Sequence, residues 1–79
     1  MWWLFEKKSE TEGTVVYNYS RETKKLDGVI VYDAANNLCE VVVPCDDDKG
    51  DEWCIDKAID KFAEVIKEGF PQRTMISIG

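Results

Sequence analysis

The sequence predicts an α+β fold, with a mostly antiparallel sheet of about five strands and one helix packed on one face of it. Two observations support this prediction. Four short segments rich in β-branched and aromatic residues occupy the first part of the chain, joined by connections too short for a parallel crossover. One amphipathic segment, from about Asp51 to Glu68, follows them, and a further β-prone segment comes after it. The expected order is therefore four strands, a helix and a last strand.

The first two predicted strands form a hairpin. Residues 2–8 begin with an aromatic and aliphatic cluster of high β-propensity and end with charged residues. The polar loop after them ends at Gly13, which can adopt the positive φ that hairpin loops use. Thr14 to Ser20 is the second strand. Alternation puts three of its large residues on one face of the sheet: Val15, Tyr17 and Tyr19.

Two more strands are predicted from Val29 to Tyr32 and from Leu38 to Val43. Both segments are rich in β-branched residues, and Pro44 ends the second because proline has no N–H for the strand ladder. The turn between them contains Asn36 and Asn37, which tolerate left-handed conformations. Because every connection is short, these four strands are expected to form an antiparallel meander.

The helix is predicted from an apolar stripe at helical spacing. The stripe consists of Ile55, Ile59, Phe62, Ala63, Ile66 and Phe70. Gly69 suits the left-handed position after a helix, and Pro71 prevents its continuation. At the other end, Asp48 or Asp51 is expected to be the N-cap. Arg73 to Ile78 then forms the last strand.

The predicted sheet has more apolar surface than one helix can cover. Five strands span roughly 20 Å, because neighbouring strands lie about 4.8 Å apart, whereas a helix is only about 10 Å wide. Apolar residues nevertheless lie on both faces of the predicted strands, where a half-solvated sheet would alternate apolar with polar residues. This surplus predicts a second covering layer, most simply another copy of the chain. The alternative is a curled sheet with scattered exposed aromatic residues.

Length and charge exclude several classes of protein. The 79 residues allow a single domain, residues 1–79. The net charge of −6 argues against a nucleic-acid partner, since phosphate binding depends on clustered Lys and Arg. The chain has no histidine, which removes the commonest general base and the commonest metal ligand. No motif for nucleophilic catalysis or phosphate binding is present, so a non-catalytic role is favoured and no cofactor is expected.

The cellular setting is predicted from apolar runs and cysteines. No run approaches the length of a membrane span, and the apolar start is too short for a signal peptide, so we expect a cytoplasmic protein without a membrane partner. Cys39, Cys45 and Cys54 fit this, because an odd count at uneven spacing is unlike a secreted disulfide framework. Their spacing also matches no paired zinc motif. We expect them to act as small apolar residues.

The acidic segment Asp46–Glu52 precedes the helix. Its alternating carboxylates superficially resemble a calcium loop, but the Gly, the bidentate Glu and the entering helix of an EF-hand are not in place. The segment is better interpreted as an acidic helix start that the helix dipole stabilises. It also offers a docking edge for a basic partner.

The leading functional hypothesis is a small cytoplasmic protein–protein interaction or self-assembly module without catalytic activity. It would act as a homodimer or other homo-oligomer, through an apolar sheet face or the Trp-rich first strand. One alternative is an acidic inhibitor or immunity-like protein with a basic partner. Another is a small thiol or metal sensor that uses the cysteines. The candidate contact residues are Trp2, Trp3, Phe5, Ile30, Tyr32, Asp46, Asp48 and Asp51.

Overall fold

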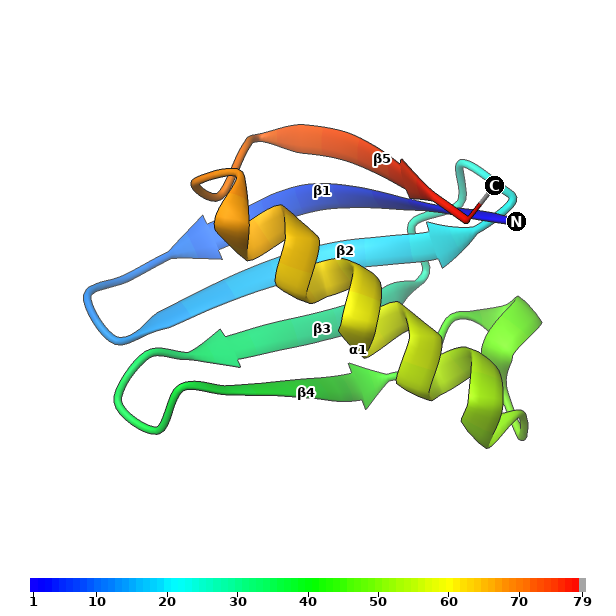
Figure 1. Ribbon diagram of the computed structural model, residues 1–79, viewed down its shortest axis with the longest axis horizontal. Coiled ribbons are helices and arrows are strands. Elements are labelled where there is room, and N and C mark those ends of the chain that lie inside the picture. The colour runs from blue at the N-terminus through cyan, green and yellow to red at the C-terminus, as the bar shows by residue number, and fades with distance from the viewer. Residues whose placement is uncertain (79) are drawn as a thin grey trace.

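The computed structural model describes residues 1–78, and these form a five-stranded antiparallel sheet with one α-helix on one face (Figure 1). The elements are β1 (Trp2–Glu10), β2 (Thr14–Arg21), β3 (Gly28–Asp33), β4 (Leu38–Val43), a short 3-10 turn η1 (Asp46–Asp48), α1 (Glu52–Lys67) and β5 (Arg73–Ser77). The predicted α+β class and the predicted order of elements are both confirmed.

The strand order in the sheet is β4-β3-β2-β1-β5. Strands β1 to β4 form the expected meander, because each hairpin connection is short enough to place consecutive strands side by side. The last strand, β5, returns to pair antiparallel with β1. The Trp-rich first strand, β1, therefore lies inside the sheet, and β4 and β5 are the two edge strands of the sheet.

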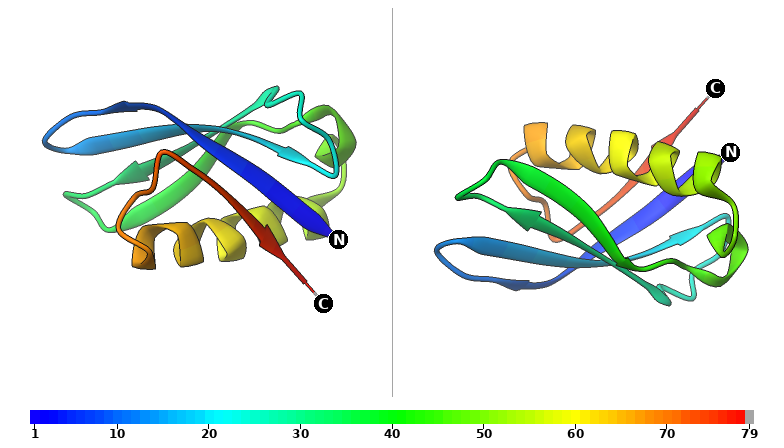
Figure 2. Two further views of the ribbon diagram at one scale, coloured as in Figure 1. Left: turned by 90° about the horizontal axis from the view of Figure 1, so that it is seen from above. Right: turned by 90° about the horizontal axis from the view of Figure 1, so that it is seen from below.

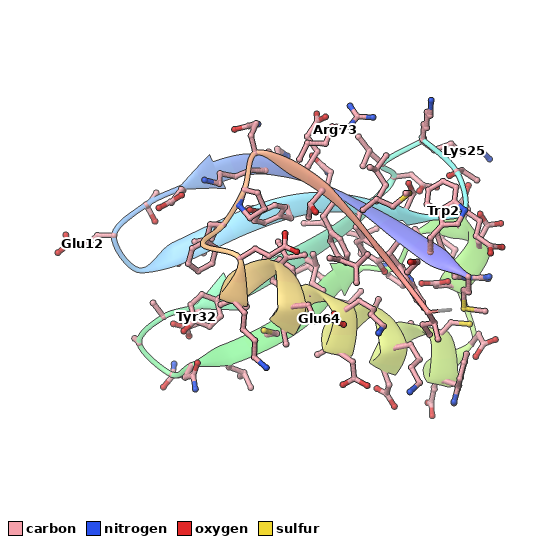
Figure 3. All side chains as sticks on the ribbon, turned by 45° about the horizontal axis from the view of Figure 1, so that its top comes forward. Trp2, Glu12, Lys25, Tyr32, Glu64 and Arg73 are labelled. Carbon is pink, nitrogen blue, oxygen red and sulfur yellow. The ribbon has the colours of Figure 1, made fainter. Side chains whose placement is uncertain are left out.

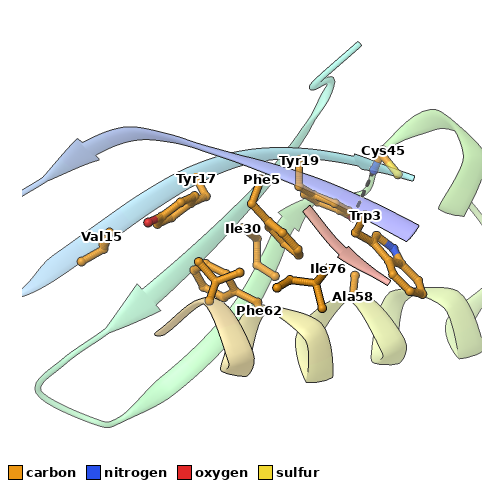
Figure 4. Packing of buried hydrophobic residues seen from close by; sticks show 11 residues of the cluster. Trp3, Phe5, Val15, Tyr17, Tyr19, Ile30, Cys45, Ala58, Phe62 and Ile76 are labelled. Carbon is orange, nitrogen blue, oxygen red and sulfur yellow. Dashed lines mark hydrogen bonds between the residues drawn. The ribbon is translucent and has the colours of Figure 1, made fainter. Parts of the chain in front are cut away.

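Large aromatic side chains fill the space between sheet and helix (Figure 4). Phe62 of α1 lies at the centre, with its ring centroid 5.8 Å from that of Phe5 and 5.3 Å from that of Tyr17. Tyr19 stacks on Phe5 at 6.1 Å. The buried core around them also contains Trp3, Val15, Ile30, Cys45, Ala58, Val65 and Ile76. Alternation along β1 and β2 thus places the bulky residues on the face that the helix covers.

Gly28 is required where Tyr19 crosses the sheet. The two residues are direct cross-strand partners, and a Cβ on Gly28 would collide with the Tyr19 ring. The ring therefore lies flat over the glycine and stays buried. From there the Tyr19 hydroxyl accepts a hydrogen bond of 3.2 Å from the backbone N–H of Cys45. This contact ties the chain after β4 back to the sheet.

The helix buries a different stripe from the predicted one. Its fully buried residues are Cys54, Ala58, Phe62 and Val65. The predicted stripe was wrong in part: Ala63 is exposed, and the isoleucines of the stripe are only half-buried. The reason is that the small Ala58 and Cys54 let the helix approach the sheet closely, so the bulkier isoleucines lie to one side.

The ends of the helix follow its predicted signals. Asp51 is the N-cap, and its carboxylate accepts a hydrogen bond of 3.1 Å from the N–H of Cys54. Asp48, the other candidate, lies in η1. Gly69 has a φ of 89°, as a residue just after a helix commonly does. Phe70 then packs against Tyr32, with ring centroids 5.7 Å apart.

The helix lies on one side of the sheet only (Figure 2). It starts beyond the end of β4 and crosses the strands diagonally toward β5 (Figure 1). Within residues 1–78, no element covers the opposite face of the sheet. We call that opposite surface the open face.

Candidate interaction surface

The open face carries apolar side chains in two groups. Cross-strand pairing places Leu4, which is itself buried, beside the exposed Met75, with Trp2 two residues away on the same strand, and this makes the group on β1 and β5. The second group lies on β2, β3 and β4. It consists of Val16, Val29, Val31, Leu38 and Val43, which pair with one another or alternate along these three strands.

Several of these side chains are largely exposed. Met75 exposes 59% of its surface, Leu38 57% and Val43 42%. Val42, at the register shift between β3 and β4, exposes 56%. Scattered exposed apolar residues are ordinary, but Met75, Leu38 and Val43 share one side of a sheet with further half-exposed valines. The open face therefore has the character of a contact surface.

A polar row separates the two apolar groups. Arg73 on β5, Glu6 on β1 and Asn18 on β2 lie side by side in register. The Arg73 guanidinium, on the side of the sheet away from α1, is 2.9 Å from the Glu6 carboxylate (Figure 3). The amide of Asn18 donates to the carbonyl of Gly28 at 3.3 Å. Because the ion pair is exposed, it adds at most about 1 kcal/mol to stability, but it puts one charge of each sign on the open face.

Asp48 lies in a buried network at the end of the sheet. Its side chain is 0% exposed, its carboxylate pairs with Nε of Arg21, and it accepts a 3.3 Å hydrogen bond from Nε1 of Trp3. Nη2 of Arg21 also donates to the carbonyl of Asp47 at 2.6 Å. The hydrogen bond to Asp48 raises the pKa of Arg21. This network fastens η1 to β1 and β2, so Asp48 is unavailable to a partner.

The other candidate acids are engaged locally. Asp46 pairs with Lys49 at 3.2 Å, and hydrogen bonding to this lysine lowers the pKa of its carboxyl group. The hydrogen bond from Cys54 likewise lowers the pKa of Asp51, as expected for an N-cap. In the described part of the chain, no group of three or more Cys, Asp or Glu side chains is close enough to hold a metal ion.

The three thiols lie in apolar surroundings. Cys45 and Cys54 are buried and Cys39 is half-buried, and all three are free. Burial raises the pKa of each, that of Cys45 to about 11 with a further contribution from the charge of Asp48. Thiols with a raised pKa are weak nucleophiles and weak metal ligands at neutral pH, so their environment gives no support for a sensor.

No pocket is present among residues 1–78 that would hold a small substrate. The tyrosines in the core have raised pKa values because they are buried, that of Tyr17 reaching about 12. The hydroxyl of Tyr17 donates to the carbonyl of Pro71 at 2.5 Å. This contact anchors the segment between α1 and β5, so the tyrosine has a structural role here.

The predicted contact residues fall in different places. Trp2 lies on the open face, where it is half-exposed. Trp3, Phe5 and Ile30 are 0% exposed beneath the helix, because they are the large residues that the helix selects as its packing face. Tyr32 is half-buried on the helix side, against Phe70. Of the five apolar candidates, only Trp2 contributes to the open face.

Sequence reasoning left out Leu38, Val43 and Met75, the most exposed apolar residues of the open face. Alternation places Met75 and Ile76 on opposite faces of the sheet, but it does not indicate which of the two faces the helix covers. The missing signal was the strand order, since the edge position of β4 and β5 is what leaves these residues exposed.

Comparison with known proteins gave no match. No protein-family model, no curated protein and no solved structure is similar to the chain. Within residues 1–78, the helix is not long and apolar enough to cross a membrane. The function must therefore be argued from the surface of this chain alone.

Proposed function

We propose that this chain is a cytoplasmic protein–protein interaction module without catalytic activity, which self-associates through the open face of its sheet. The observation that carries the proposal is the set of exposed aliphatic side chains on that face. A sheet face of this composition commonly packs on a second layer. The three free thiols suit a reducing compartment such as the cytoplasm.

The size of the face supports a second copy as the covering layer. The sheet lies in the plane of Figure 1. In this plane the molecule measures 30 by 21 Å, so its rectangular outline has an area of about 600 Å². Two copies stacked over this whole outline would bury at most about 1,200 Å² together, which is above the ~1,000 Å² that a specific contact needs as a minimum. A self-complementary surface of this size closes as a two-fold dimer.

The charges on the open face favour its own copy as well. Glu6 on β1 and Arg73 on the edge strand β5 form one ion pair on it, and Asp33 and Glu40 add two carboxylates on the side of β4. A two-fold axis near the ion pair would bring Glu6 of one copy near Arg73 of the other. The aliphatic groups on either side of the polar row would then interdigitate, as between two packed sheets about 10 Å apart.

The first experiment compares Val16→Lys with Ala63→Lys. Val16 lies on the open face, whereas Ala63 is exposed on the outer side of α1, and both substitutions change the net charge equally. Val16→Lys would bury an unpaired charge in the dimer, which costs several kcal/mol. We expect a dissociation constant raised at least tenfold for Val16→Lys and unchanged for Ala63→Lys.

The measurement is molar mass by sedimentation over a range of concentrations, with circular dichroism to verify folding. One copy has a mass of 9.1 kDa. A wild-type mass above this value that falls only in Val16→Lys supports the proposal. A wild-type chain that stays at the mass of one copy at millimolar concentration contradicts it.

An acidic inhibitor is the second candidate, favoured by one observation. Asp47, Glu52 and Asp56 are exposed around the start of α1, in a chain with a net charge of −6. However, Lys49 and Lys57 lie among them and pair with neighbouring acids, which weakens the local negative field. We therefore rank it below self-association. A salt-sensitive complex with a basic protein that Asp47→Lys abolishes would reverse this ranking.

A further inference from the structure

The two edges of the sheet differ in how well they are protected. On β5, polar residues occupy three of five positions: Arg73, Thr74 and Ser77. On β4 the only charged residue is Glu40, and three consecutive valines end the strand. Natural edge strands commonly carry Lys, Pro or an early bulge that prevents further pairing. The register shift in β4 comes only near its end, so Leu38 to Val41 pair regularly with β3, and Glu40 is the one charged side chain on this part of the edge.

Apolar side chains flank β4 on both faces of the sheet. On the open face, Leu38 and Val43 are exposed. On the helix side, Cys39 and Val41 are half-buried, because α1 passes over the end of β4 and continues diagonally toward β5 (Figure 1). The apolar residues at the margin of the core are likewise incompletely covered: Tyr32, Ile59, Ile66 and Phe70. An added strand would thus meet apolar surface in both layers as well as unpaired backbone groups.

We propose that β4 pairs with β4 of a second copy, antiparallel, so that one continuous sheet runs through two molecules. Antiparallel pairing of a strand with its own copy follows from a two-fold axis normal to the sheet, which closes the contact at two molecules. This inference rests on the proposed self-association and adds a second contact to it. The axis keeps both helices on one side and joins the two open faces on the other.

The pattern of β4 selects one register. Residues directly opposite in an antiparallel pair point to the same face, so the open-face residues Leu38 and Glu40 must meet open-face residues of the other copy. Placing Glu40 opposite Glu40 would put two like charges in contact, which is destabilising. Shifting the pairing by one pleat places Leu38 opposite Glu40 and Cys39 opposite Cys39. This register avoids the repulsion, keeps the facing of Leu38, Cys39 and Glu40, and limits the strand pairing to these three residues, because Val41 would meet Asn37 of the turn.

Two substitutions of Leu38 test the register. Leu38 is exposed, so neither replacement buries a charge in the monomer. Because Leu38 lies opposite Asp33 within the molecule, urea denaturation of both diluted variants verifies that the β3–β4 pair is intact. Leu38→Glu would put an acid opposite Glu40 twice in each pair and is expected to weaken the contact at least fivefold. Leu38→Arg would put a base there and is expected to maintain or strengthen it.

The readout is the crosslinking of Cys39 to Cys39 between two copies. Diamide oxidises the two thiols to one disulfide and takes up the two electrons and two protons, and the linked pair is seen on a non-reducing gel. Opposed residues of neighbouring strands are close enough for a disulfide with small adjustments. We expect linked pairs in wild type and Leu38→Arg, at least fivefold fewer in Leu38→Glu, and none in Cys39→Ser.

The outcomes separate this inference from the proposed function. No Cys39 crosslink, in a chain whose mass still exceeds one copy, overturns the β4 contact and leaves the open-face contact standing. The same holds if Leu38→Glu and Leu38→Arg crosslink equally, since the register is then wrong. A crosslink that persists in Val16→Lys supports the β4 contact independently of the open face. A mass of one copy without a crosslink overturns both.

Discussion

The two faces of the sheet are both apolar, yet they are built from different side chains. The covered face presents aromatic rings, with Phe5, Tyr17 and Tyr19 around Phe62 of the helix. The open face presents mainly aliphatic residues and an exposed ion pair. Aromatic rings have the largest area to bury, so the helix stabilises the chain most by covering them. Side-chain size, more than the alternation of apolar and polar residues, explains which face the helix occupies.

The largest expected effect comes from the covered face. Phe62→Ala removes the ring that contacts both Phe5 and Tyr17, and leaves a cavity between sheet and helix. We expect a loss of about 3–5 kcal/mol in the free energy of unfolding, measured by urea denaturation. In a domain this small, such a loss would leave a substantial unfolded fraction without denaturant. A loss below about 1 kcal/mol would show that the contact between helix and sheet is not the main source of stability.

An intermediate effect is expected at the end of the sheet. Asp48→Ala leaves Nε1 of Trp3 without its acceptor and Arg21 without its carboxylate partner. We expect a loss of roughly 1–3 kcal/mol in the free energy of unfolding, moderated because Arg21 is partly exposed and can be hydrated. Asp47→Ala is the matched control, since only the backbone carbonyl of Asp47 takes part in the network. Equal losses in the two variants would contradict a specific role for Asp48.

The smallest effect is expected on the open face. Met75→Thr changes a side chain that is 59% exposed and does not belong to the buried core. At concentrations too low for association, we expect the free energy of unfolding to fall by less than about 1 kcal/mol. Urea denaturation of the diluted protein measures it. A loss as large as that of Phe62→Ala would mean that the open face stabilises the monomer and is not reserved for a partner.

The sequence predicted the local structure well, because its signals are local. Each strand begins and ends within two residues of its expected bounds; the largest difference is in β1, which extends to Glu10 and so lengthens its hairpin with β2. Asp51 and Gly69 mark the ends of the helix through their own capping and φ preferences. These features depend on residues that are neighbours in the chain, so they can be predicted from a single sequence.

The arrangement of these elements could not be predicted from the same patterns. A four-stranded meander has two free edges, and nothing in the sequence of β5 indicates that it pairs with β1 and not with β4. The burial of Asp48 depends on that arrangement too, because Arg21 and Trp3 come from two other strands. An acidic segment before a helix gives no local sign that one of its carboxylates turns inward. The sequence alone could not show that four of the candidate contact residues are buried in the monomer: Trp3, Phe5, Ile30 and Asp48.

The pairing of β1 with β5 has a consequence for how the chain is made. Trp3 pairs with Ile76, so β1 has no partner on its outer side until β5 has been synthesised. During synthesis the meander can form first, and β1 then presents its apolar residues at a temporary edge of the sheet. β5 is short and largely polar, and it contributes Ile76 to the core. When β5 pairs with β1, it therefore completes the core and covers this edge. Until that step the outer side of β1 is an unpaired apolar strand edge, which is the kind of surface that favours aggregation.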